Sequence, residues 1–166
     1  EEALDRATKA LIESNTELAE KNVAFDQEID QKMKEIEALC LKLLLSQQPV
    51  ARDLRLISAS LKLVSDLERI GDQCAHISGI VLKFPENYPQ GLESEHIPLM
   101  ADATKKMVKE SVDAFARGDV ELARAVCKYD DVLDDLFYAV RRSLVAVIPE
   151  SNSDGEKIVD VLMVAK

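Results

Sequence analysis

Three pairs of acidic residues, each separated by four positions, are the part of this sequence best suited to chemistry. The pairs are Asp26 with Asp30, Glu68 with Asp72, and Asp130 with Asp134. In an α-helix this spacing brings both side chains onto one face, one turn apart. Carboxylate oxygens gathered on such a face are hard donors that suit multivalent cations. The pairs therefore predict metal ligation, and the prediction depends on their recurrence, because a single pair of this kind is common.

Two of these acids continue an apolar stripe. The stripe, which we predict to be buried, consists of Leu54, Ile57, Leu61 and Val64, and the same helical line then passes through Glu68 and Asp72. Carboxylates facing a core each cost on the order of several kcal/mol unless they are protonated, paired or bound to a cation. Three explanations stay open. Arg55, Lys62 and Arg69 can pair with the acids, the stripe can border a solvated concave face, or cations can bind the acids.

Six stretches with helical periodicity carry these residues. We expect helices over about 2–14, 16–46, 50–82, 98–117, 120–148 and 156–166. Proline, glycine and asparagine separate them, most clearly in the loop around 84–97. Gly118 suits a left-handed helix C-terminus, and Asp119 suits the N-cap of the next helix. No segment alternates with a period of two, so the sequence predicts an all-α fold.

The two halves of the chain repeat each other. A shift of 104 residues superposes Asn15 on Asp119, Asp26 on Asp130, and Asp30 on Asp134. At a shift of 101 the third helix matches the last, and the chain stops before the counterpart of Glu68. We therefore predict a three-helix bundle over 1–83 with an incomplete first helix, and a linker loop over 84–97. A second three-helix bundle follows over 98–166, with an incomplete last helix.

Composition excludes several classes of protein. The chain has 21 Lys and Arg against 31 Asp and Glu, a net charge of −10, which argues against a nucleic-acid partner. No apolar run approaches the roughly 18 residues of a membrane span. Cys40, Cys74 and Cys127 lie in apolar periodic sequence, so we predict buried free thiols in a cytoplasmic protein.

Histidine and lysine residues give weaker signals. His76 lies one turn beyond Asp72, and we predict a partly exposed helix residue rather than a ligand. Glu93 and His96 have the spacing of a di-iron ligand pair, but they fall in the linker loop rather than on a bundle helix. Lysines 105, 106 and 109 are typical of a solvated helix face.

Two stretches carry a resemblance to a known family. Residues 47–55, QQPVARDLR, and residues 61–72, LKLVSDLERIGD, strongly resemble the PhoU family of phosphate-transport accessory and regulatory proteins. The resemblance covers nearly the whole chain and implies two repeated three-helix bundles. It also implies multinuclear metal clusters, of iron or zinc, held by E(D)-x-x-x-D motifs. Carried over by motif, the ligands would be Asp26, Asp30, Glu68, Asp72, Asp130 and Asp134.

This sequence departs from the family pattern in its second half. The chain ends before a fourth acidic pair, and Arg141 stands at the repeat position of Glu37. The completeness of a second cluster therefore stays open.

The resemblance also implies a function. PhoU-like proteins are negative regulators that link the ATPase of the phosphate ABC transporter to the phosphate-sensing histidine kinase. It implies a protein without enzyme activity, located in the cytoplasm and peripheral to the membrane through those partners. A homodimer is an open possibility. Two alternative functions also stay open, a carboxylate-bridged metalloenzyme and a regulatory domain of a sodium–phosphate cotransporter.

Overall fold

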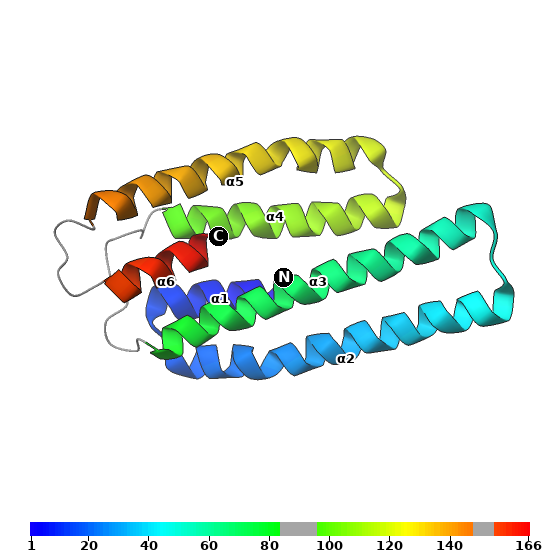
Figure 1. Ribbon diagram of the computed structural model, residues 1–166, viewed down its shortest axis with the longest axis horizontal. Helices are drawn as coiled ribbons and strands as arrows, with labels where there is room; N and C mark the ends of the chain where they lie inside the picture. The colour runs from blue at the N-terminus through cyan, green and yellow to red at the C-terminus, as the bar shows by residue number, and fades with distance from the viewer. Residues whose placement is uncertain (84–95, 148–154) are drawn as a thin grey trace.

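The computed structural model describes residues 1–83, 96–147 and 155–166, which form six α-helices (Figure 1). They are α1 Glu2–Glu13, α2 Thr16–Gln47, α3 Ala51–Lys83, α4 His96–Arg117, α5 Val120–Val147 and α6 Gly155–Ala165. No strand occurs in these residues, and the all-α prediction is confirmed. Each helix boundary lies within two residues of its predicted place. Helix α4 begins at His96, so Pro98 lies in its first turn, where proline is tolerated.

The turns that open α2 and α5 have the same geometry, as the repeat predicts. Ser14 and Gly118 both adopt the left-handed conformation, with φ of 51° and 66°. Asn15 and Asp119 then cap the helices that follow, each accepting a hydrogen bond from a backbone N–H three residues on. The bonds run from Leu18 N to Asn15 Oδ1 at 3.0 Å and from Leu122 N to Asp119 Oδ1 at 2.9 Å. Local capping chemistry therefore fixes both turns.

The helices pack as two groups that share a core. Helix α1 packs on α2 and α3, while α4 packs on α5 and α5 on α6. In Figure 1, α1 and α6 lie between the α2–α3 pair and the α4–α5 pair. One buried cluster draws on both halves, with Leu11 and Val81 from the first and Met100, Val140 and Leu144 from the second. The repeat units are therefore joined through apolar contacts and not through the linker alone.

The far end of the α2–α3 pair extends beyond the other helices (Figure 1). Its apolar side chains are largely exposed, 83% at Leu45 and 75% at Val50. Leu54 is 46% exposed, so the prediction of a buried stripe is wrong at its outer end, while Val64 further along is buried. The reason is that no third described helix covers this end. None of the described helices combines the length and apolar character needed to cross a membrane.

The prediction of three buried thiols is correct for two of them. Cys40 and Cys74 are buried, whereas Cys127 is exposed. On α5 the inward position belongs to Val126, which is 6% exposed. The next residue is rotated by about 100° around the helix axis and therefore points to solvent. All three cysteines are free thiols.

Candidate metal centre

Three of the predicted ligands converge between α2 and α3. Asp26 and Asp30 lie one turn apart on α2, and Asp72 approaches them from α3. One carboxylate oxygen from each can be chosen so that all three lie within 4.8 Å of one another. Metal–oxygen bonds of about 2.0–2.6 Å place two ligands of one ion at most about 5 Å apart. The separation therefore fits three oxygens bound to a shared cation.

The negative charges of these acids repel one another. Burial raises the pKa of Asp26 above its usual range, and the neighbouring Asp72 and Asp30 raise it further. Glu68 lies at the edge of the group, outside the set of three. Desolvation raises the pKa of Glu68, and the charges of Asp72, Asp30 and Asp26 add to the effect, while Arg69 opposes it. The site therefore carries unfavourable negative charge that a bound cation would relieve.

One buried carboxylate oxygen of Asp26, Oδ1, receives no hydrogen bond from the described residues. Pairing with nearby basic residues was one alternative explanation for these acids. Lys62 and Arg69 instead pair with Asp66, at 2.9 and 3.7 Å, and Asp66 is not among the predicted ligands. The buried oxygen is the kind of atom that a metal ion satisfies, so the residues present fit a cation.

A glycine brings the two helices together at this point. Gly71 precedes Asp72 on α3 and is buried against α2. A Cβ atom placed on it would lie 2.9 Å from Ile29 Cδ1 and 3.6 Å from Asp26 Oδ1. The absence of a side chain thus lets α2 approach α3 where the acids meet. Residue spacing does not mark Gly71 as a site residue, although a glycine inside a strong helical pattern indicates a packing reason.

A buried polar group lies one turn from Asp26 on α2. Asn22 is 1% exposed, and its Nδ2 donates to Ser78 Oγ at 2.9 Å and to the carbonyl oxygen of Cys74 at 3.3 Å. The Ser78 hydroxyl donates to the same carbonyl at 3.0 Å. These bonds tie α2 to α3 beside the acidic group and help to hold both helices in register. Asn22 was not predicted from the sequence, because a lone asparagine on a helix carries no distinctive pattern.

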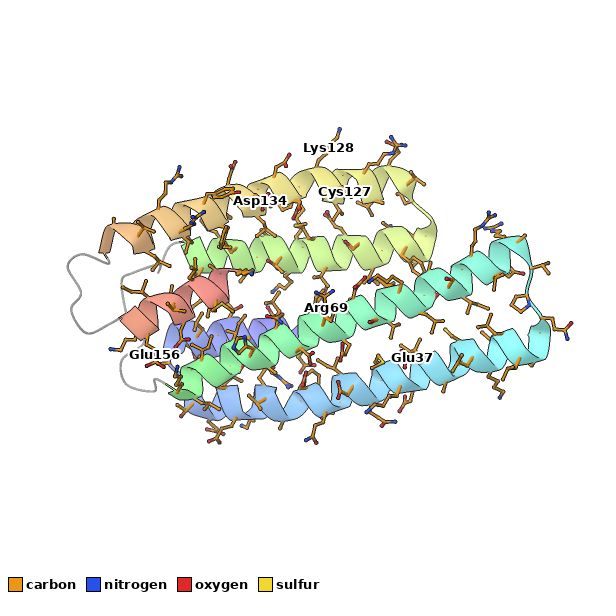
Figure 2. The ribbon with its side chains drawn as sticks, viewed as in Figure 1. Glu37, Arg69, Cys127, Lys128, Asp134 and Glu156 are labelled. Carbon is orange, nitrogen blue, oxygen red and sulfur yellow. The ribbon has the colours of Figure 1, made fainter. Side chains whose placement is uncertain are left out.

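The third predicted pair is not gathered in the same way. Asp130 and Asp134 are exposed on α5. No acid, histidine or cysteine from another described helix joins them in a three-residue group. In Figure 2, Asp134 lies on α5, away from the α2–α3 pair where Glu37 and Arg69 are labelled. The described residues therefore do not assemble a second group of three ligands around this pair.

The histidines contribute nothing to the acidic group. His76 lies on α3, where it is exposed rather than partly exposed as predicted, and it does not belong to this group. His96 begins α4, and Glu93 lies outside the described residues, so the E-x-x-H pair has no described geometry. The candidate centre thus consists of aspartate oxygens, with Glu68 at its edge.

Comparison with known proteins places the chain in a family. The family model for the PhoU domain matches residues 1–81 and 97–166. A phosphate-specific transport system accessory protein PhoU homolog of Aquifex aeolicus is 35% identical over 166 residues, covering 100% of this chain and 75% of the relative. The homolog of the same name in Pseudomonas putida is also 35% identical, covering 98% of this chain and 63% of that protein. The chain therefore spans roughly two thirds to three quarters of the length of these relatives.

Solved structures agree with the sequence matches. PhoU from Pseudomonas aeruginosa superposes with a TM-score of 0.89 at 33% identity, covering 99% of this chain and 78% of that one. The phosphate transport system regulatory protein PhoU from Streptococcus pneumoniae gives a TM-score of 0.85 at 27% identity, covering 99% and 80%. The all-helical architecture of the chain is the one these proteins share. On the family match, the sequence identity and the fold together, the chain belongs to the PhoU family.

Proposed function

We propose that this chain is a metal-binding regulatory accessory protein of phosphate uptake. The observation that carries the proposal is the convergence of Asp26, Asp30 and Asp72 around a buried carboxylate oxygen without a hydrogen-bond donor. The family match supplies the biological setting, because the relatives are named as accessory proteins of the phosphate-specific transport system.

The three aspartates would hold the first ion, and Glu68 would extend the site. Four carboxylates in one place offer up to eight oxygens, more than one ion of iron or zinc requires. A multinuclear cluster is therefore the arrangement we expect. Bound cations would neutralise the acids and clamp α2 to α3. Asp130 and Asp134 would be half of a second site, which needs acids from a further helical segment.

The proposed partners are the ATPase of the phosphate ABC transporter and the phosphate-sensing histidine kinase. Through them the protein would act in the cytoplasm at the membrane surface, as a negative regulator of the phosphate-starvation response. The relatives are named as accessory proteins of the phosphate-specific transport system, which supports a place beside the transporter. The net charge of −10 favours protein partners over nucleic acid. A binding assay between the purified protein and each partner, with and without metal, tests this part of the proposal.

Metal analysis with a matched pair of variants tests the centre itself. Protein expressed with ample iron and zinc is purified as wild type, Asp72→Asn and Asp66→Asn. Asp66 is the control because it lies on the same helix and pairs with Lys62 and Arg69 outside the acidic group. We expect wild type and Asp66→Asn to retain metal and Asp72→Asn to bind it at least about 10-fold more weakly. An absence of metal from all three proteins would overturn the proposal.

The alternative of a carboxylate-bridged metalloenzyme gains no support from the described residues. Such sites usually combine carboxylates with histidine ligands. The acidic group contains aspartates only, and His76 points to solvent. We therefore propose a regulatory role for the metal rather than a catalytic one.

A further inference from the structure

We propose that Gly71 acts as a positioning residue for the metal centre, by setting the distance between α2 and α3 where the ligands meet. The inference rests on the proposed metal-binding function and deepens it. Gly71 itself offers no ligand atom. It acts through Ile29, the α2 residue that contacts its backbone position.

The contact between the helices at Gly71 leaves no room for a side chain. A Cβ atom built there lies 2.9 Å from Ile29 Cδ1 and 3.1 Å from Ile29 Cγ2. Both distances are shorter than ordinary carbon–carbon contacts of about 3.5–4.0 Å. An alanine at this position therefore requires Ile29 or the helix that carries it to move.

Ile29 is poorly able to move by itself. It packs against a buried cluster of Ala3, Ala7 and Cys74. Phe25 and Ile70 pack against the same cluster. Its side chain is β-branched, so Cγ2 can leave only by rotation of χ1, which a helix strongly restricts. The strain of an added methyl group is therefore expected to pass to the backbone and push α2 away from α3.

Displacement of α2 from α3 would move the metal ligands apart. Gly71 is adjacent to Asp72, and Ile29 is adjacent to Asp30 and three residues from Asp26. Ligand distances in metal sites hold to within about 0.2 Å, so a helix shift of a few tenths of an ångström is enough to weaken binding. A glycine inside a helix lowers helix propensity relative to alanine. Close ligand placement is a benefit that offsets this cost.

The test compares two glycine substitutions on one helix. Gly71→Ala and Gly79→Ala give α3 the same gain in helix propensity, but nothing lies within 4 Å of a Cβ built at Gly79. Zn²⁺ is titrated into each metal-free protein against a competing chelator. We expect Gly71→Ala to bind Zn²⁺ about 10- to 100-fold more weakly than wild type, the range for residues that support ligands. Gly79→Ala should bind like wild type.

A rescue variant separates positioning from general damage. Ile29→Ala removes both atoms that the new methyl group would strike, so Gly71→Ala combined with Ile29→Ala should bind Zn²⁺ more tightly than Gly71→Ala alone. Crystal structures of the metal-free proteins supply a readout that needs no metal. They should show α2 and α3 further apart at Ile29 in Gly71→Ala than in wild type.

The outcomes distinguish this inference from the proposed function. If wild type takes up neither Zn²⁺ nor, in a parallel titration, Fe²⁺, the proposed function fails and the inference fails with it. If wild type binds Zn²⁺ and Gly71→Ala binds it as tightly as Gly79→Ala does, only the inference fails. Weak binding by Gly71→Ala without recovery in the double variant also overturns it, because the loss would not then pass through Ile29.

Discussion

Asp26 combines burial with two acidic neighbours, and together they raise the pKa of its carboxyl above the ordinary value of 3.8. A raised pKa means that the folded state holds the proton more tightly than the unfolded state does. The stabilising effect is complete below the ordinary value and disappears as pH rises through the raised one. In the metal-free protein, ionised Asp26 is therefore a source of instability at neutral pH.

Replacing this carboxyl should stabilise the metal-free protein as the pH rises. We expect Asp26→Asn to match wild type near pH 3, below that ordinary value, and to exceed its free energy of unfolding by about 0.5 kcal/mol at pH 7, the scale of one like-charge pair on a helix. Urea denaturation in the presence of a chelator measures both values. A difference between the two proteins that does not change with pH would contradict the expectation.

Metal should reverse the order of these two proteins. A ligand that binds only the folded state adds about 2.7 kcal/mol at a concentration 100 times its Kd. We expect Zn²⁺ at that concentration to stabilise wild type by this amount and to leave Asp26→Asn nearly unchanged, because Asp26 supplies one of the three convergent oxygens. Thermal unfolding with and without Zn²⁺ shows the effect. Equal stabilisation of both proteins would place the ion elsewhere.

Residue spacing predicted part of this centre. The four-residue spacing placed Asp26 and Asp30 on one helix face, and convergence with Asp72 is what the structure adds. Spacing alone did not show that no third ligand from another described helix joins Asp130 and Asp134, since that depends on which side chains lie beside α5. The role of Gly71 could not be predicted from spacing, because it depends on a contact with Ile29, 42 positions earlier in the chain.

Helix boundaries followed the sequence closely because local chemistry sets them. Asn15 and Asp119 cap α2 and α5 through bonds that involve residues only three positions away. The burial of a helix face depends instead on its neighbours. The stripe through Leu54 and Val64 was correctly placed on α3, but only a covering helix makes it buried, and the described residues supply none at the outer end.

The two equivalent turns give a reciprocal prediction. Ser14 adopts a φ of 51°, a conformation that is unfavourable for any residue with a Cβ, whereas Gly118 adopts a φ of 66° without that penalty. We expect Ser14→Gly to raise the free energy of unfolding by about 0.5–1 kcal/mol and Gly118→Ser to lower it by a similar amount. Urea denaturation of both variants tests this. Changes of the same sign would show that the two turns are not equivalent.

The buried cluster that joins the halves makes the molecule more than two linked bundles. Leu11 of α1 and Val81 of α3 lie in the same cluster as Met100 of α4 and Val140 of α5. Neither half can lose this surface without exposing the other. Although the sequence predicted two repeated units, it did not predict their shared core, because each apolar stripe could equally be buried within its own unit.

A cavity made in one half should therefore weaken the other. Leu144 on α5 is 2% exposed, and Leu144→Ala should lower the free energy of unfolding by about 2–5 kcal/mol. Because its cluster includes Leu11, hydrogen exchange of the α1 and α3 amides should accelerate along with that of α5. Leu45→Ala makes the same chemical change at a side chain that is 83% exposed. It should change the free energy of unfolding by no more than about 0.5 kcal/mol and leave hydrogen exchange in α1 and α3 nearly unchanged. Faster exchange confined to α4, α5 and α6 would mean that the halves unfold independently and that their shared core does not couple them.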